Sequence, residues 1–66
     1  MPIIRVELLS GRTVDQKRDF ARAITDCASK ILVCSPEAVA VVFDDVVPHN
    51  WADGGVLISD KTAGKT

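Results

Sequence analysis

The sequence predicts an α+β protein made of one β-α-β unit with parallel strands, followed by a short C-terminal strand. Three observations support this fold class: a branched apolar run over residues 3–9, helical periodicity over residues 14–33, and a nearly all-apolar run over residues 39–43. A strand, a long helix and a second strand form a right-handed crossover, so the strands are expected to be parallel. The 66 residues are expected to form a single domain, 1–66.

Residues 3–9 have the alternation of a strand. Their apolar residues at even positions share one face, whereas Arg5 and Glu7 point to the other face. The dipeptide Ser10-Gly11 ends this strand.

A helix is predicted from Val14 to about Val33. Thr13 and Gln16 have the spacing of a capping box, in which each side chain accepts a backbone N–H from the other residue. Apolar residues recur at intervals of three and four, and charged residues, Lys17 among them, occupy the opposite side. The apolar residues are Phe20, Ala23, Ile24, Cys27, Ala28 and Ile31. Ser35-Pro36 ends the helix because proline lacks a backbone donor.

The region after the helix is predicted to hold a second strand and a loop-rich end. Residues 39–43 are nearly all apolar, which indicates a strand buried on both faces. Residues 46–52 form a loop with room for a short helical turn, and Asp53-Gly54-Gly55 is a turn signal before a short strand over residues 56–58. Residues 59–66 are expected to form a flexible tail or an arm that clasps a partner.

A chain of 66 residues needs stabilisation beyond its own small core. Cys27 and Cys34 both fall on the predicted helix, separated by roughly 10 Å at a rise of 1.5 Å per residue, which is beyond disulfide reach. We expect two buried thiols in a reducing compartment.

His49 is the only histidine in the sequence, which favours the interpretation of His49 as an ordinary loop residue over a metal ligand or a general base. Oligomerisation is therefore the expected source of the additional stabilisation, because unpaired apolar strand edges can pair with another copy of the chain.

Composition excludes several classes of function. A net charge of −1, a pI of about 5.6 and only three aromatic residues argue against a nucleic-acid partner. The sequence has no apolar run of membrane-spanning length and no N-terminal secretion signal. We therefore expect a cytoplasmic protein with no membrane partner.

Four residues are candidates for chemistry, each with a purely structural alternative. Pro2 follows a removable Met1, and a free Pro2 would be a secondary amine that can take a proton; it can also simply begin a strand. Arg12 can grip a carboxylate or remain a solvated turn residue. The Trp51 ring either forms a wall of a substrate pocket or anchors an interface between subunits. Asp53 begins a turn or acts as a base that orients water.

Together these features resemble the 4-oxalocrotonate tautomerase family. The match runs from Pro2 to about Ile58 and includes Gly11-Arg12-Thr13 followed by Asp15-Gln16-Lys17, then Asn50-Trp51 and Gly54-Gly55. The resemblance implies a β-α-β subunit that pairs into dimers and assembles as a hexamer, a trimer of dimers. It also implies that no cofactor is used and that Pro2, freed of Met1, is the catalytic base or acid.

The resemblance further implies an anionic substrate of aromatic catabolism, an unsaturated 2-hydroxy or 2-keto acid such as 2-hydroxymuconate. An α-amino group has a pKa of about 7.7–8.0, and desolvation and nearby arginines favour its neutral form. Arg12 is expected to hold a substrate carboxylate, and Trp51 to wall the pocket. A second arginine of the family, on the strand after the helix, is replaced here by Ala40.

Ala40 leaves two alternatives open. The segment Asn50-Trp51-Ala52-Asp53 resembles the α subunit of trans-3-chloroacrylic acid dehalogenase, which implies a hydratase or hydrolytic dehalogenase in which Asp53 activates water. That subunit's additional carboxylate-binding arginine falls at Leu9, so Leu9 is the corresponding substrate-binding position. Alternatively, the chain is a non-catalytic partner in a hetero-hexamer with a paralogous subunit that supplies the missing cation.

Overall fold

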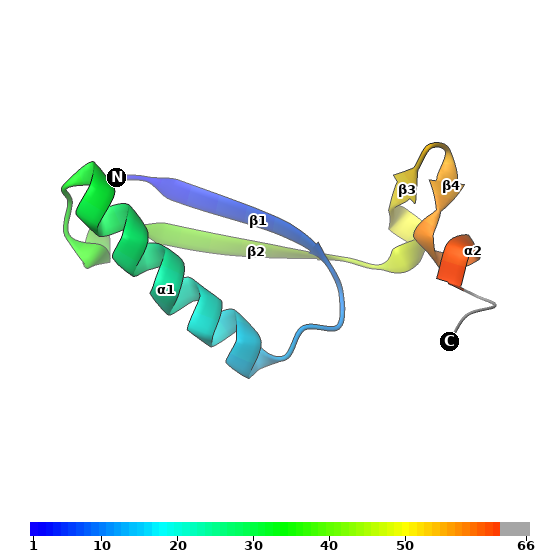
Figure 1. The fold of residues 1–66 in the computed structure, drawn as a ribbon, viewed down its shortest axis with the longest axis horizontal. Coiled ribbons are helices and arrows are strands. Elements are labelled where there is room, and N and C mark those ends of the chain that lie inside the picture. The colour runs from blue at the N-terminus through cyan, green and yellow to red at the C-terminus, as the bar shows by residue number, and fades with distance from the viewer. Residues whose placement is uncertain (63–66) are drawn as a thin grey trace.

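Two parallel strands and the helix that connects them form the main body of the molecule (Figure 1). The computed structural model describes residues 1–62. Strand β1 (Ile3–Leu9) pairs in parallel with β2 (Ala40–Val46), in a register that runs from Ile3 opposite Ala40 to Leu9 opposite Val46. Helix α1 (Val14–Leu32) makes the crossover. The predicted β-α-β unit with parallel strands is therefore confirmed.

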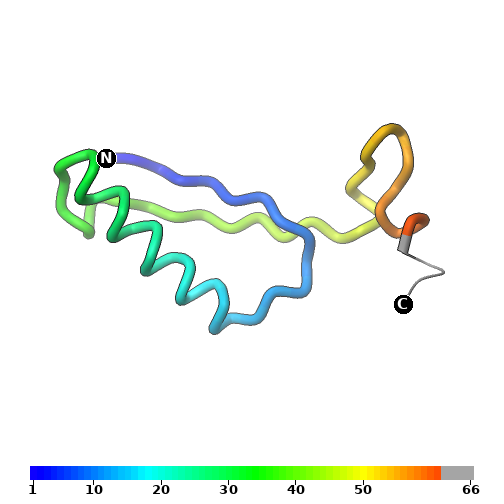
Figure 2. The backbone as a smooth tube through the Cα atoms, viewed as in Figure 1, coloured from blue at the N-terminus to red at the C-terminus, as the bar shows by residue number. Residues whose placement is uncertain are grey.

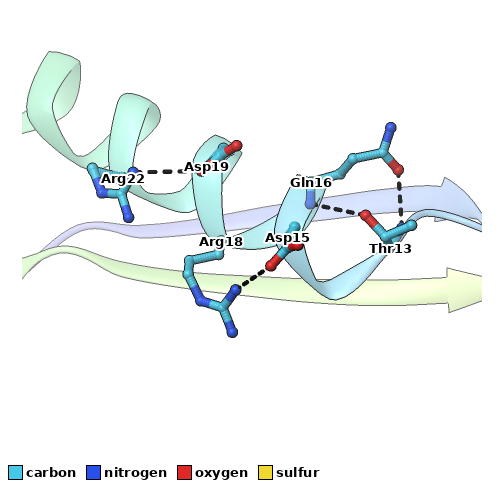
Figure 3. A network of polar contacts seen from close by, with 6 residues as sticks. All are labelled: Thr13, Asp15, Gln16, Arg18, Asp19 and Arg22. Atoms are coloured by element: carbon cyan, nitrogen blue, oxygen red, sulfur yellow. Dashed lines mark hydrogen bonds and ion pairs between the residues drawn. The ribbon is translucent and has the colours of Figure 1, made fainter.

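The start of α1 carries the predicted capping box (Figure 3). The backbone N–H of Gln16 donates to Thr13 Oγ1 at 3.1 Å, and the backbone N–H of Thr13 donates to Gln16 Oε1 at 2.9 Å. These two bonds satisfy donors that have no partner within the helix. Figure 3 also shows ion pairs on the outer surface of α1, between Asp15 and Arg18 and between Asp19 and Arg22.

The end of α1 corrects the prediction for the two cysteines. Val33 adopts a left-handed conformation with φ of 56°, and the backbone N–H of Cys34 donates to the Ser29 carbonyl at 3.1 Å. This turn ends the helix at Leu32, so Cys34 lies beyond it. Cys27 is exposed and Cys34 is half-buried. The prediction of two buried thiols on one helix is wrong.

Strand β2 is displaced and longer than the predicted strand over residues 39–43. Val39 instead follows a 3₁₀ turn, η1 (Pro36–Ala38), and the strand continues through Asp44 and Asp45. The parallel ladder extends along the whole of β1, and this pairing overrides the polar character of the two aspartates. Val42 is 40% exposed, so a single chain does not provide the expected burial on both faces.

The C-terminal arm, residues 48–62, projects past the end of the sheet (Figures 1 and 2). It holds the predicted helical turn, η2 (Pro48–Asn50), and a hairpin of β3 (Ala52–Asp53) and β4 (Val56–Leu57). The short C-terminal strand thus exists, but it pairs with β3 rather than with the main sheet. Gly54 and Gly55 have φ of 61° and 81°, which suits a tight hairpin turn.

Helix α2 (Ile58–Thr62) occupies the beginning of the expected tail. The predicted strand over residues 56–58 therefore ends at Leu57, and the remainder of the tail, residues 63–66, lies outside the described residues. No helix in the described part of the chain is long and apolar enough to cross a membrane. The radius of gyration is 15.4 Å, compared with about 11 Å for a compact chain of this length.

The apolar core is incomplete in a single chain. Among the residues whose exposure is described, 1–61, no hydrophobic side chain is fully buried. Phe20 of α1 packs edge-to-face on Phe43 of β2, with ring centroids 6.1 Å apart. By contrast, Ile3 is 65% exposed and Ile31 is 73% exposed. The chain therefore presents apolar surface that only further contacts could remove from water.

Candidate active site

Pro2 lies immediately before β1 and is held by the sheet. The backbone N–H of Ala40 donates to the Pro2 carbonyl at 3.0 Å. Pro2 is half-buried, whereas Met1 is 91% exposed. Proline has no N–H to contribute to the ladder and is tolerated at a strand start. The sheet thus fixes the Pro2 backbone and leaves the residue before it in solvent.

Position 40 stands beside Pro2 because of the strand register. Ala40 is the residue opposite Ile3, and its own N–H contacts Pro2. Its side chain is a methyl group, so this part of β2 offers no cation beside Pro2.

Arg12 lies in the connection between β1 and α1, directly before the helix cap. Gly11 precedes it with φ of 123°, a backbone conformation that suits glycine. Arg12 borders a cavity of about 240 Å³ between α1 and the sheet. The other lining residues are Val6, Leu8, Gln16, Lys17, Phe20 and Phe43. An arginine at the rim of an apolar cavity can bind the carboxylate of a small organic acid.

Lys17 borders the same cavity, so its predicted place on the solvent side of the helix is wrong. Its side chain is only 25% exposed, forms an ion pair with Asp45, and has its Nζ 6.0 Å from the Phe43 ring centroid. The signal that identifies it is its spacing of three from Phe20, which places both residues on the same face of α1. Lys17 therefore ties α1 to β2 beside Arg12.

Trp51 and Asp53 come together in the C-terminal arm. Trp51 Nε1 donates to Asp53 Oδ1 at 3.3 Å. The Trp51 carbonyl accepts from the backbone N–H of Ile58 at 2.8 Å, which anchors the start of α2. A second cavity, of about 290 Å³, is lined by Glu7, Val46, Asn50, Trp51 and Ala52.

The two cavities lie on opposite faces of the sheet. Val6 and Leu8 border the first, whereas Glu7 borders the second, and neighbouring residues of a strand face opposite sides. Arg12 follows the end of β1, and Trp51 follows the end of the neighbouring strand β2. Within one chain the two residues nevertheless border different cavities.

Pro2 lies at the far end of β1 from Arg12. The seven residues of β1 span roughly 20 Å at 3.3 Å per residue. Leu9, the remaining predicted position, is half-buried near the Arg12 end, opposite Val46. Of the predicted site residues, all of which the structure describes, only Trp51 and Asp53 share a side-chain hydrogen bond within a single chain.

His49 lies exposed in η2. Among residues 1–62, no group of three or more histidine, cysteine, aspartate or glutamate side chains is placed to hold a metal ion.

The fold and these positions define a small β-α-β protein with a strand-initial proline and an arginine after the same strand. The chain belongs to the tautomerase family: the family described as "Tautomerase enzyme" matches residues 2–61. It is 38% identical over 61 residues to a probable tautomerase of Staphylococcus epidermidis, covering 92% of this chain and 100% of that protein. It is 32% identical over 63 residues to a probable tautomerase of Lactiplantibacillus plantarum, covering 96% and 98%.

Solved structures give the same result. A 4-oxalocrotonate tautomerase homologue is 42% identical, with a TM-score of 0.87 and coverage of 91% of this chain and 95% of that one. A 4-oxalocrotonate tautomerase isozyme from Methylibium petroleiphilum is 32% identical, with a TM-score of 0.90 and coverage of 94% and 97%. A heterohexamer 4-oxalocrotonate tautomerase from Chloroflexus aurantiacus is 28% identical, with a TM-score of 0.85 and coverage of 91% and 97%.

Proposed function

We propose that this protein is a cofactor-free tautomerase acting on an unsaturated 2-hydroxy or 2-keto acid such as 2-hydroxymuconate, with Pro2 as the proton-transfer group after removal of Met1. Family membership supports the reaction type. The assignment of proton transfer to Pro2 is supported by its fixed position. The backbone N–H of Ala40 donates to the Pro2 carbonyl at 3.0 Å and holds Pro2 at the start of β1. The reaction belongs in the cytoplasm, in aromatic catabolism.

In this mechanism the Pro2 nitrogen accepts a proton from the dienol acid and returns it to a carbon atom, which gives the conjugated keto acid. The base must be neutral to act. Its ordinary pKa is about 7.7–8.0, and each unit of lowering disfavours the charged amine by about 1.4 kcal/mol. Modest desolvation therefore frees the base at pH 7.

Arg12 binds the substrate carboxylate in this proposal, and Trp51 excludes water from the other side. One chain separates Pro2 from Arg12 by the length of β1, roughly 20 Å. A small acid cannot bridge that distance, so the working site combines residues of different copies. We propose dimers that assemble as a hexamer, and the exposed apolar surface of the single chain supports this assembly.

The primary test is the ketonisation of 2-hydroxymuconate and phenylenolpyruvate, followed by ultraviolet absorbance, with the N-terminus verified by intact mass. The proposal expects turnover only from protein that lacks Met1, since the nitrogen of Pro2 is otherwise an amide. Equal turnover by a form that retains Met1 would exclude Pro2 as the base.

A hydratase or hydrolytic dehalogenase is the second candidate, and the Trp51–Asp53 hydrogen bond favours it. The 3.3 Å bond from Trp51 Nε1 holds one carboxylate oxygen of Asp53 beside an aromatic wall, where the carboxylate could activate water. Halide release from 3-haloacrylates tests this candidate. The reaction should occur in the unaltered protein and be lost in Asp53→Asn; no release, or equal release by both proteins, rejects it.

A non-catalytic role in a hetero-hexamer is the third candidate. It is favoured by Ala40, which places a methyl group beside Pro2, and by the similar chain of a heterohexamer tautomerase. A fully active assembly that contains only this chain, observed by native mass spectrometry, would exclude this role.

A further inference from the structure

The side chains of Trp51 and Asp53 are brought together by the local backbone of the C-terminal arm. Trp51 has φ of −133° and ψ of 121°, which is extended backbone, and Asp53 belongs to strand β3. Side chains two residues apart in an extended segment project to the same side. The hydrogen bond of 3.3 Å from Trp51 Nε1 to Asp53 Oδ1 follows from this arrangement.

Hydrogen bonds also hold the backbone of both residues. The Trp51 N–H donates to the Pro48 carbonyl at 3.4 Å, and the Trp51 carbonyl accepts from the Ile58 N–H at 2.8 Å. Asp53 lies opposite Val56 in the antiparallel pair of β3 and β4. Because the backbone is fixed, the freedom left to the indole is rotation about its side-chain bonds, and the bond to Asp53 restricts that rotation.

The hydrogen bond determines which part of the indole faces the second cavity. The N–H is the only hydrogen-bond donor of a tryptophan side chain. Trp51 lines the cavity of about 290 Å³, but its N–H is directed to Asp53, which is not among the lining residues. The indole therefore presents apolar ring surface to the cavity. Such a surface suits the unsaturated carbon chain of an organic acid rather than its carboxylate.

Asp53 is better placed to hold the ring than to contact a substrate. Its side chain forms no ion pair within residues 1–62, so no cation competes with the indole for the carboxylate. A carboxylate that activates water must lie within hydrogen-bond reach of that water in the pocket. Within one chain, Asp53 borders neither of the two cavities described above. The geometry therefore favours an action of Asp53 through Trp51.

We propose that Asp53 is a positioning residue, which orients the Trp51 indole as an apolar wall of the substrate pocket and acts on the substrate only through Trp51. This deepens the proposed function and rests on its assignment of Trp51 to the pocket. It differs from the hydratase candidate in what is required of Asp53. Water activation needs an ionised carboxylate that can accept a proton, whereas orientation of the ring needs only a hydrogen-bond acceptor.

Two substitutions of Asp53 separate these requirements. Asp53→Asn keeps an oxygen acceptor without the charge, and Asp53→Ala removes the acceptor. The value of kcat/KM for 2-hydroxymuconate ketonisation should stay within roughly threefold of the unaltered protein in Asp53→Asn and fall roughly tenfold in Asp53→Ala, as for the loss of one hydrogen bond to a charged group. Asp60→Ala removes an exposed carboxylate from α2 of the same arm, and this matched control should leave kcat/KM unchanged.

The orientation of the ring can be measured without a substrate. Trp51 is the only tryptophan of the chain, which has no tyrosine, so the indole band of the near-ultraviolet circular dichroism spectrum reports on Trp51 alone. This band should keep its intensity in Asp53→Asn and in the Asp60→Ala control. It should weaken in Asp53→Ala, because a ring that is free to rotate no longer has fixed surroundings.

A double-mutant cycle with Trp51→Phe tests whether Asp53 acts through the indole. Phenylalanine keeps an aromatic wall but has no N–H to donate. In the Trp51→Phe background, Asp53→Ala should lower kcat/KM by less than about twofold, because the bond that it breaks is already absent. An undiminished loss in that background would overturn the proposal, since Asp53 would then act independently of the ring.

An Asp53→Asn variant that behaves like Asp53→Ala also overturns the proposal, as does an Asp53→Ala variant with unaltered spectrum and kcat/KM. Asp53→Leu, which lacks an acceptor but fills a similar volume, replaces Asp53→Ala if that variant does not assemble. Failure of both to assemble would show that Asp53 supports the arm itself and would overturn the proposal. The expected spectra without turnover by any form would contradict the proposed reaction alone, and turnover that is indifferent to the acceptor would contradict this inference alone.

Discussion

The backbone N–H of Ala40 donates to the carbonyl of Pro2 at 3.0 Å. This bond extends the parallel ladder by one residue beyond β1 and aligns the start of β2 with the candidate base. It makes position 40 the place on β2 from which a side chain would most directly influence Pro2. The alanine found there means that any cation near the amine must come from another element or another copy.

Arg12 is predicted to act in substrate binding. Arg12→Ala removes a charged hydrogen bond, a loss of roughly 1.5–3 kcal/mol, and should raise KM for 2-hydroxymuconate about ten- to a hundredfold. Arg18→Ala is the matched control, because Arg18 is 58% exposed on α1 and pairs only locally with Asp15. Steady-state kinetics measures both. Unchanged KM in Arg12→Ala would remove Arg12 from the site.

The capping box is predicted to stabilise the start of α1. Thr13→Ala leaves the Gln16 N–H without its 3.1 Å partner and should lower the free energy of unfolding by about 1 kcal/mol. Thr13→Ser keeps the hydroxyl and should recover most of this loss. Denaturant unfolding at a fixed protein concentration makes the comparison, since assembly also contributes to stability. Equal losses in both variants would show that the hydroxyl is not the cause.

Val33→Gly is predicted to stabilise the protein. Val33 has φ of 56° and is 87% exposed, so its β-branched side chain is strained and packs little. The left-handed conformation costs about 1–2 kcal/mol for such a residue, and the added chain entropy of glycine offsets part of this gain. A net gain of roughly 0.5–1 kcal/mol is expected.

Val47→Gly is the control for that substitution. Val47 has φ of −72°, which valine adopts without strain, so glycine there should lower stability. The same unfolding experiment measures both variants. Stability changes of the same sign at the two positions would contradict the strain argument at Val33.

The local part of the fold could be predicted from the sequence because its causes are local. Alternation over residues 3–9, the Thr13–Gln16 spacing and the periodicity of α1 each depend on neighbouring residues. Strand β2 could be placed only in part, because Asp44 and Asp45 are strand residues through pairing with the distant β1. Lys17 differs, because its spacing of three from Phe20 already places it on the face of α1 that meets the sheet, where the ion pair with Asp45 holds its side chain.

The residues of the candidate site could be predicted from the sequence, but their arrangement in space could not. The sequence identifies Pro2, Arg12, Trp51 and Asp53 as chemical groups, yet no local pattern shows that Pro2 and Arg12 occupy opposite ends of one strand. It also does not show that Trp51 and Arg12 border different cavities. These separations depend on the whole topology. They are the reason that the proposed site requires more than one copy of the chain.

The free amine of Pro2 is the group that we propose transfers the proton. The most direct test measures kcat/KM for 2-hydroxymuconate ketonisation with the unaltered protein and with Pro2→Ala, after intact mass has verified that both lack Met1. Native mass spectrometry verifies that both assemble alike. A fall of roughly a hundredfold or more in Pro2→Ala is the predicted result, because the primary amine of alanine lacks the ring that orients the proline nitrogen, and the contribution of an acid–base group depends on its positioning. Equal values in the two proteins would contradict it.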